Sequence, residues 1–511
     1  MSLEGGGDFG NGGALWGGMD VEIRPIDHVL RGTAGPVALI DREGVLDFAA
    51  AERAVAGMAG WLLEQGLSAG DRVATWLPKT RDACLMPLAA PRAGLVHVPI
   101  NPALRRAQVA HILEDSGASM LLSQAGRGAS LEADDVPEGC RVVDGLGIGP
   151  AVGPSDADPD RLAAILYTSG STGRAKGVML SHANLWLGAV SVASYLKLSP
   201  ADRVLAVLPL AFDYGQNQLF SSWFAGASVA PIDYLTARDV VKAVERTGAT
   251  TLAGVPPLWT QLLEADWPAE TAAKLKRLTN SGGAMTEKLV RGVRSTFFNA
   301  EFFAMYGLTE AFRSTFLDSA LIDTHFDAIG REIPHANIMV VRPDGGRAKP
   351  GEPGELVHAG PLVAQGYWGD PERTAQRFRP APAFAAYGGN AVWSGDTVIE
   401  GADGLLRFVG RDDEMIKSAG NRISPGEVEE AITAGDEVRE AVAIGVADVR
   451  MGQVIVAVVA GDPADEPALR QRLRGLLPGF MQPARYEWRE ALPRNANGKL
   501  DRAAIRREVI A

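Results

Sequence analysis

A run of small and hydroxyl-bearing residues follows an apolar, strand-like segment at Ile165–Val178 (ILYTSGSTGRAKGV). Glycines let backbone N–H groups turn toward an anion, serine and threonine hydroxyls donate further hydrogen bonds, and a lysine adds positive charge. A plain surface turn would explain the glycines, but not the strand, the hydroxyls and the lysine together. The spacing differs from a Walker A loop. The residues that we expect to contact phosphate are Thr168, Ser169, Gly170, Ser171, Thr172, Gly173 and Lys176.

This loop resembles the signature loop of the AMP-forming adenylating enzymes, which include acyl-CoA synthetases, luciferases and peptide-synthetase adenylation domains. The family's other signatures follow in its usual order and cover about residues 30–505: SGGA at 281–284, MYGLTE at 305–310, GELVHAGPLVAQGY at 354–367, SGD at 394–396, GRDDEMIKSAGNRI at 410–423 and PRNANGKL at 493–500. The ordered set is far more specific than any single motif. Within this family, the chain most resembles bacterial acyl-CoA ligases or amino-acid-activating members. Ala175 departs from the proline that the family usually has there.

The resemblance implies a nucleotide site and a role for each matching residue. Asp396 would accept hydrogen bonds from the ribose hydroxyls, although an aspartate there can also simply cap a turn. Glu310 would hold Mg²⁺, a cation that prefers carboxylate oxygens, and Thr309 beside it would donate to the α-phosphate. The other residues implied to bind ATP are Gly282, Gly283, Ala284, Tyr306, Gly307 and Arg411.

The resemblance also implies a C-terminal domain that changes its orientation. A hinge at Asp413 would allow Lys499 to enter the site as the catalytic cation of the first half-reaction. A rotation of the domain would then present Lys417 and Gly420 to a phosphopantetheine thiol, belonging to coenzyme A or to a carrier protein. A lone lysine near a chain end is otherwise an ordinary solvated side chain.

The acyl pocket in this family is built partly from the segment after a strand such as Val204–Leu210. An aspartate after phenylalanine, here Asp213, resembles the amino-acid-activating branch, in which the carboxylate pairs with a substrate ammonium. A helix cap is the competing explanation. Arg313 suits a second carboxylate or a polar tail, and a salt bridge to a neighbour is equally plausible. The predicted pocket residues are Phe212, Asp213, Tyr214, Asn217, Trp259, Ser281, Met305, Arg313 and Ser314.

Composition limits the function classes that this chain of 511 residues can serve. A net charge of -12 argues against nonspecific binding to nucleic acid or to an anionic membrane. No apolar run is long enough for a membrane span. Only Cys84 and Cys140 occur, and the seven histidines are scattered, which is typical of a reducing cytoplasmic setting without a dedicated zinc site. We expect residues 1–18, which are rich in glycine, to form a disordered tail.

Helix-like and strand-like segments alternate between about residues 50 and 410, as in Ala50–Gln65 followed by Asp71–Leu77. Such alternation predicts an α/β fold with mostly parallel sheets flanked by helices. The pattern changes after Gly410, where a polar stretch precedes a further helix and two strands. We therefore predict a large N-terminal domain over 19–410 and a small mobile α+β domain over 411–511, with the hinge near 411–413.

The motifs together predict an ATP-dependent, AMP-forming ligase with ATP, Mg²⁺ and coenzyme A or a phosphopantetheinyl carrier as the implied co-reactants. Its substrate would be a small carboxylic or amino acid. Two alternatives stay open: an amino-acid enzyme that loads a carrier protein, and a member that stops at the adenylate or uses a nonthiol acceptor.

Overall fold

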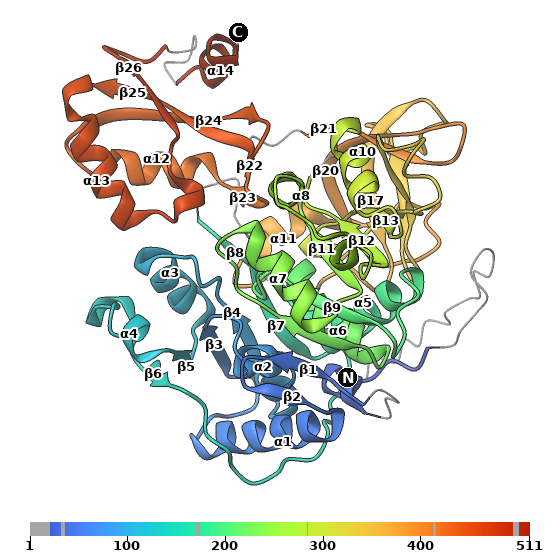
Figure 1. The fold of residues 1–511 in the computed structure, drawn as a ribbon. Coiled ribbons are helices and arrows are strands. Elements are labelled where there is room, and N and C mark those ends of the chain that lie inside the picture. Colours follow the sequence, from blue (N-terminus) through green and yellow to red (C-terminus); the bar gives the residue numbers. More distant parts are fainter. Residues whose placement is uncertain are drawn as a thin grey trace, which may run out of the picture.

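The computed structural model describes residues 21–31, 36–168, 174–283, 285–411, 415–493 and 500–510. The tail expected over 1–18 and the hinge residue Asp413 lie outside these ranges. Figure 1 shows a large body, from blue to yellow-orange, and a small C-terminal domain drawn in orange and red. Among the described helices, none combines the length and apolar character that crossing a membrane requires.

One sheet of the large body has seven described strands in the order β18-β8-β7-β4-β3-β5-β6. Their bounds are Gly366–Tyr367, Lys176–Ser181, Leu162–Thr168, Val96–Pro99, Arg72–Trp76, Met120–Ser123 and Arg141–Asp144. The pairs from β7 to β6 are parallel, while β8 and β18 add antiparallel pairs at one edge. The central strands β4 and β5 are buried throughout, as expected for parallel strands covered on both faces.

The second sheet of the large body has fourteen described strands and changes character along its length. The strands β1 (Leu39–Asp41), β10 (Ser228–Pro231), β9 (Arg203–Ala206), β11 (Thr251–Gly254), β12 (Arg277–Asn280) and β13 (Glu301–Tyr306) pair in parallel, with β2 (Gly44–Leu46) antiparallel at the edge. Antiparallel pairing joins the rest: β14 (Thr315–Leu317), β15 (Ala328–Glu332), β21 (Leu406–Arg411), β20 (Asn390–Glu400), β17 (Pro353–Ala359), β16 (Asn337–Val341) and β19 (Phe378–Pro380).

The α/β class and the two-part organisation agree with the sequence-based prediction, but parallel pairing does not extend over the whole large body. From residue 315 onward, consecutive strands are mostly joined by short loops instead of crossover helices, and short loops favour antiparallel pairing. The prediction of mostly parallel sheets is therefore wrong for this part of the body.

Helices cover the faces of both sheets. In chain order they are α1 (Phe48–Glu64), α2 (Arg81–Arg92), α3 (Arg106–Ser116), α4 (Ala125–Gly128), α5 (His182–Tyr195), α6 (Asp213–Phe224), α7 (Ala237–Thr247), α8 (Pro256–Leu263), α9 (Ala269–Ala272), α10 (Glu287–Thr296) and α11 (Pro371–Arg377). Local signals set several ends. Ser181 caps α5 by accepting from the Asn184 N–H, and Gly117 and Gly248 end α3 and α7 with φ values of 58° and 65°, where glycine is favoured.

The small domain is an α+β unit with its own core. Its described strands are β22 (Ile416–Ser418), β23 (Asn421–Ile423), β24 (Val438–Asp448), β25 (Gly452–Gly461) and β26 (Arg485–Arg489), and its helices are α12 (Pro425–Thr433), α13 (Glu466–Leu476) and α14 (Arg502–Ile510). One face of the sheet packs on α12 and α13, and the other face packs on α14 through residues such as Val442 and Ile505. In Figure 1, α14 lies on the side of this domain away from the large body.

Candidate active site

A cavity of about 570 Å³ opens between the large body and the small domain. Its walls come from the end of β7, the segment after β9, the loops after β12 and β13, strand β20, and the β22–β23 hairpin. Ligand sites in open α/β sheets commonly lie beyond the carboxyl ends of parallel strands, as this cavity does. It is the natural place for the predicted chemistry.

A buried lysine–glutamate pair adjoins the cavity. Lys176, the first residue of β8, places its Nζ 3.1 Å from Glu310 Oε1 and 2.5 Å from the Tyr367 hydroxyl oxygen. Tyr367 in turn donates to the same Glu310 oxygen at 2.7 Å. The short turn Thr309–Ala311 after β13 carries the glutamate to this point. Residues 134 positions apart therefore form one charged cluster, as the shared nucleotide role would require.

Two arginines add positive charge around this cluster. Burial raises the pKa of Glu310, but the charges of Lys176, Arg377 and Arg422 outweigh burial and lower it well below the usual range. Glu310 is therefore an anion at neutral pH. Burial lowers the pKa of Lys176 against the opposing attraction of Glu310. An excess of cationic groups around one carboxylate is what a polyphosphate would neutralise.

Tyr367, Arg377 and Arg422 were not among the predicted site residues. Tyr367 lies in the motif at 354–367 and Arg422 in the motif at 410–423, so the motifs themselves could have pointed to both residues. Arg377 comes from the last position of α11 and is brought in by the packing of that helix near β18 and β19. Nothing in its local sequence distinguishes it from a surface arginine.

The predicted ribose residue lies deep in the cavity wall. Asp396 is 2% exposed, its Oδ2 accepts a hydrogen bond from the Tyr306 hydroxyl, and its backbone pairs with Arg411 across β20 and β21. Across the cavity, the Thr168 hydroxyl is buried and has no hydrogen-bond partner in the part of the chain that the structure describes. A buried hydroxyl without a partner at a cavity wall is suited to a ligand atom.

Two residues of opposite charge lie where the acyl pocket is predicted. Asp213 begins α6 and accepts from Thr309 Oγ1 at 3.1 Å, while Arg313 Nη2 lies 3.9 Å from the Asp213 Oδ2. The Arg313 guanidinium also donates to Ser281 Oγ at 3.1 Å and lies over the Tyr214 ring at 4.6 Å. Asp213 and Arg313 thus face each other before any substrate arrives. The Arg313 side chain is 2% exposed, and its Nε has no acceptor among the described residues.

The small domain contributes its β22–β23 hairpin to the cavity. Lys417, Ala419 and Gly420 line the wall, and Lys417 Nζ lies 5.5 Å from the centre of the Phe408 ring. Gly420 has φ +78, and an added Cβ would lie 2.8 Å from the Val255 side chain of the large body. Glycine is therefore required here both by its backbone conformation and by the close approach of the two domains.

Most of the predicted site residues converge on this cavity. Its lining includes Thr168, Phe212, Asp213, Tyr214, Ser281, Gly282, Gly283, Met305, Tyr306, Gly307, Thr309, Arg313, Asp396, Lys417 and Gly420. The predicted residues that lie outside the described ranges are Ser169, Gly170, Ser171, Thr172, Gly173, Ala284, Asp413 and Lys499.

The described neighbours of Lys499 lie on the far face of the small domain. The Asp501 N–H donates to the Pro493 carbonyl oxygen at 2.9 Å, and Leu500 packs against the cluster that α14 forms on the sheet. The arrangement of the domains therefore presents the β22–β23 hairpin to the cavity, and the opposite sheet face points away.

Three predicted pocket residues do not belong to the described lining of the cavity. Trp259 turns inward and packs against Phe297 and Phe302 in the core of the large body. Ser314 is fully buried and hydrogen-bonds to His358 Nδ1 at 3.0 Å. Asn217 lies one turn beyond Asp213 on α6 and is 2% exposed. The packing of α8 and α6 turns Trp259 and Asn217 into the interior, and Ser314 is buried in the segment between the Thr309–Ala311 turn and β14; sequence spacing reveals none of this.

A close helix contact supports the turn that carries Glu310. Phe312 has φ +61, and its ring packs on Gly188 of α5, where an added Cβ would lie 2.3 Å from the ring. Gly188→Ala is expected to lower the free energy of unfolding by about 1–3 kcal/mol through overpacking, and to displace the Thr309–Arg313 turn. Denaturant unfolding measures the first effect. Gly126→Ala, with nothing within 4 Å of the added Cβ, is the control, and equal stability of the two variants would contradict this account.

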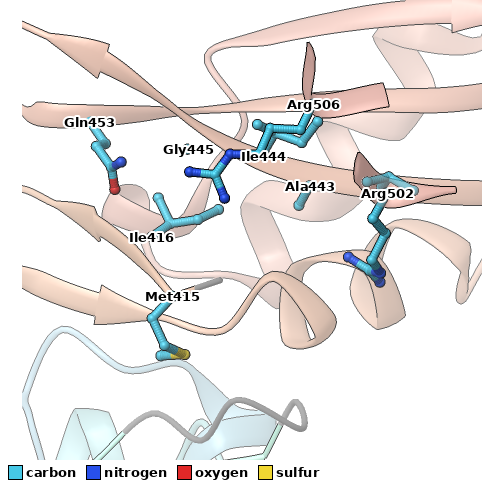
Figure 2. Close-up of a pocket in the computed structure, with 9 residues that line it drawn as sticks. Met415, Ile416, Ala443, Ile444, Gly445, Gln453, Arg502 and Arg506 are labelled. Atoms are coloured by element: carbon cyan, nitrogen blue, oxygen red, sulfur yellow. The ribbon is translucent and has the colours of Figure 1, made fainter. Parts of the chain in front are cut away.

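A second, separate cavity of about 40 Å³ lies inside the small domain. Figure 2 shows Arg502 and Arg506 of α14 above Ile416 and Met415, with Gln453 at the other end. Arg502 pairs with Glu429 at the rim. This space can hold a few water molecules at most, and it shares no lining residue with the larger cavity, so it is not part of the candidate site.

Comparison with known proteins supports the same assignment. The family model of the AMP-binding enzymes matches residues 26–368, and that of the AMP-binding enzyme C-terminal domain matches 427–499. A linear gramicidin synthase polypeptide of Brevibacillus parabrevis is 31% identical over 93% of this chain, which spans only 6% of that protein. Feruloyl-CoA synthase of an Amycolatopsis species is 32% identical over 94% of this chain and 97% of its own length.

A solved structure resembles the whole chain. The o-succinylbenzoate CoA synthetase MenE of Bacillus subtilis, as a double mutant bound to a product analogue, superposes with a TM-score of 0.82 at 25% identity, covering 95% of this chain and 98% of its own. The predicted family is therefore confirmed. Both family models match in order, and the predicted ribose aspartate and the hairpin line one cavity beside the charged cluster. The chain therefore belongs to the AMP-binding enzyme family.

Proposed function

We propose that this protein couples a carboxylic acid to a phosphopantetheine thiol at the expense of ATP. In the first step a carboxylate oxygen attacks the α-phosphorus of ATP, and pyrophosphate leaves. In the second step the thiol sulfur attacks the acyl carbon, the thiol proton is lost, and AMP leaves. The single observation that carries this proposal is the cavity that joins the Lys176–Glu310 cluster, the Asp213–Arg313 end and the Gly420 hairpin.

The described residues suit a bound nucleotide. Tyr306 and the backbone at Gly282 and Gly283 would bracket the base, and Asp396 would accept from the ribose hydroxyls. Glu310 Oε1 already accepts from Lys176 and Tyr367, while its Oε2 takes no hydrogen bond in the described part. One free carboxylate oxygen fits Mg²⁺, which commonly uses a single protein carboxylate together with phosphate oxygens. When bound there, the ion would offset the negative charge of the phosphates.

The acceptor thiol would approach past the β22–β23 hairpin. Gly420 and Val255 both line the cavity, and a Cβ at position 420 would lie 2.8 Å from the Val255 side chain, so a larger residue would disturb this wall. Coenzyme A and a carrier protein share the pantetheine arm, so either acceptor suits the proposal. The relatives include both kinds by name: the feruloyl-CoA synthase above, and an L-proline–carrier protein ligase of Pseudomonas fluorescens that is 29% identical over 98% of its length.

Pyrophosphate release over a panel of amino, short-chain, dicarboxylic and aryl acids is the first experiment. Acid-dependent release, followed by thioester formation with coenzyme A or with a carrier protein, is the expected result. Release without a thioester to either acceptor would favour the adenylate-only alternative. No release with any acid would contradict the proposal.

The Asp213–Arg313 pair favours acids without an α-ammonium group. An ammonium bound to Asp213 would lie close to the Arg313 guanidinium, and two like charges about 5 Å apart repel by roughly 3 kcal/mol at an effective dielectric constant near 20. Arg313 instead offers donors to a hydroxyl, carbonyl or second carboxylate at the far end of the acid. The carrier-loading amino-acid alternative is thereby the weaker one.

Arg313→Met is expected to shift the preference toward amino acids by tenfold or more, because Asp213 then becomes free to pair with an ammonium. The ratio of pyrophosphate release with an amino acid to that with its deaminated analogue measures the shift. Asp213→Asn is the matched control, in which the ratio should fall. A wild-type preference for amino acids would contradict this assignment of the pair.

A further inference from the structure

One amide side chain bridges the large body and the small domain beside the active-site cavity. Gln108 lies in the first turn of α3, and its Nε2 donates to the backbone oxygen of Leu476, the last residue of α13, at 3.1 Å. Its Oε1 accepts from the Arg105 N–H at 3.1 Å, at the N-terminal end of α3. Figure 1 shows α3 facing α13 and α12 across this boundary.

The bridge satisfies backbone groups at two helix ends at once. The first N–H groups and the last carbonyls of any helix have no partner within the helix. Gln108 serves one of each: the start of α3 in its own domain and the end of α13 in the other. If the small domain turned away, the Leu476 carbonyl would exchange this partner for water, so the bond belongs to this domain arrangement alone.

A carboxyl group reinforces the same contact. Glu427, in the first turn of α12, lines the cavity together with Gln108, Ile112, Phe480 and Met481, and the nearby Gln108 amide opposes the rise in its pKa that burial causes. The charged group that faces it from its own helix is Glu430, and no cation of the described residues opposes it. The apolar side chains around it come from α3 and from the turn Gly479–Met481.

Two ion pairs that join the domains are solvent-exposed. Arg450 Nη2 lies 2.9 Å from Glu264 Oε2, with side chains 68% and 52% exposed, and Arg174 lies 3.9 Å from Glu430. Exposed pairs of this kind contribute little to stability. The part-buried bond from Gln108 to Leu476 is a directional polar contact between the domains, beside the attraction of Arg422 for Glu310.

We propose that Gln108 and Glu427 form an interdomain latch that holds the small domain in the arrangement used for thiol transfer. The inference rests on the proposed function, because it assigns the presentation of the Lys417–Gly420 hairpin to the second half-reaction. Gln108 acts as a positioning residue: it touches no reacting atom but sets how often the hairpin faces the cavity.

The latch depends on pH through Glu427. Burial raises the pKa of this carboxyl to about 7 in the present arrangement, whereas an exposed glutamate has a pKa near 4.5. A raised pKa means that protonation favours this arrangement, so the contribution is fully present below about 4.5 and is lost as pH rises through about 7. Glu427→Gln should abolish this dependence and keep the latch closed at about pH 8.

Gln108→Glu is the sharpest test because glutamate retains the acceptor that caps α3 but loses the donor to Leu476 and places a second carboxylate against Glu427. We expect thiol transfer from a supplied acyl-adenylate to fall about tenfold, the equivalent of one lost hydrogen bond, while acid-dependent pyrophosphate exchange stays within about twofold or rises. Glu427→Gln in the same chain should restore part of the loss. Equal changes in both half-reactions, or no change in either, would overturn the latch.

A readout independent of activity reports the domain arrangement directly. Glu264→Cys and Arg450→Cys place thiols on the two sides of the domain boundary, where the parent side chains lie 2.9 Å apart in this arrangement, with Cys140→Ser removing the partly exposed native thiol. A bismaleimide long enough to join the two shortened side chains should crosslink this background efficiently, and the yield should fall when Gln108→Glu is added. An unchanged yield overturns the latch. A wild type that releases no pyrophosphate with any acid overturns the proposed function instead, and the crosslinking result separates the two failures.

Discussion

Replacing Glu310 with glutamine is expected to slow acid-dependent pyrophosphate exchange by about two to three orders of magnitude. Glutamine keeps the shape and can still accept from Tyr367, but it removes a negative charge that lies among Lys176, Arg377 and Arg422. In the proposed role Glu310 would hold Mg²⁺ beside the phosphates, and loss of one such charge-stabilising contribution commonly costs this much in rate. Exchange of labelled pyrophosphate into ATP, at saturating acid, measures the effect.

The same substitution should also change stability. Removing one partner of a buried ion pair leaves the other charge without compensation, at a cost of about 3–5 kcal/mol. Bound nucleotide should restore part of this loss, since its phosphates would take the place of the missing carboxylate. A thermal scan with and without ATP analogues tests that recovery.

Asp202→Asn is the matched control for Glu310→Gln. Asp202 forms an equally buried pair with Arg277 at 2.9 Å, but the pair lies outside the lining of the cavity. We expect a similar loss of stability with exchange activity unchanged when both proteins are assayed well below their melting temperatures. If the two variants lost exchange to the same extent, stability alone would explain the result, and Glu310 would lose its assigned role.

Replacing Lys499 with alanine is expected to abolish most pyrophosphate exchange, by roughly two to three orders of magnitude, and to spare the second half-reaction. The family resemblance assigns to this lysine the charge developed when the carboxylate displaces pyrophosphate, and one such donor is worth about 3–4 kcal/mol. The domain arrangement seen here presents the Lys417–Gly420 hairpin instead. A supplied acyl-adenylate should therefore react with the thiol at a rate within about threefold of wild type, because the Lys499 ammonium takes no part in the proposed second step.

Lys274→Ala is the control for this experiment, since its ammonium donates to the Glu245 carbonyl oxygen at the surface of the large body, away from the cavity. Near-normal exchange in Lys499→Ala would remove the residue from the mechanism. Loss of both half-reactions to the same degree would mean that the lysine is needed for folding or for nucleotide binding in general.

Much of the site could be predicted from the sequence because its parts are local motifs. A strand, a glycine turn and the side chains that it carries are contiguous, so Thr168, Gly282, Tyr306 and Asp396 were predictable as members of one nucleotide site, and all four line the cavity. The helix and strand positions followed for the same reason, as in α7 at Ala237–Thr247, where apolar periodicity is strong. Turn conformation and hydrophobic periodicity each depend on residues that are close together in the chain, so both can be predicted from the sequence.

The antiparallel half of the large sheet and the orientation of pocket side chains could not be predicted in this way. Trp259 and Asn217 have the residue types and spacing of pocket walls, but the packing of α8 and α6 turns them into the core. Arg377 reaches the charged cluster only because α11 packs beside β18. Side-chain direction depends on how an element is rotated against its neighbours, which is a property of the packed interior.

The order of residues along the chain was therefore enough to predict the family and the α/β class, which are confirmed, and to propose the chemistry of the nucleotide motifs, since short-range patterns encode them. The folded arrangement was needed to establish that Asp213 faces Arg313 and that Gln108 reaches Leu476. These contacts join residues far apart in the chain, and their distances follow from how two domains and several helices pack. Charge pairing and hydrogen bonding act over a few ångströms, so they are set only once the chain has folded.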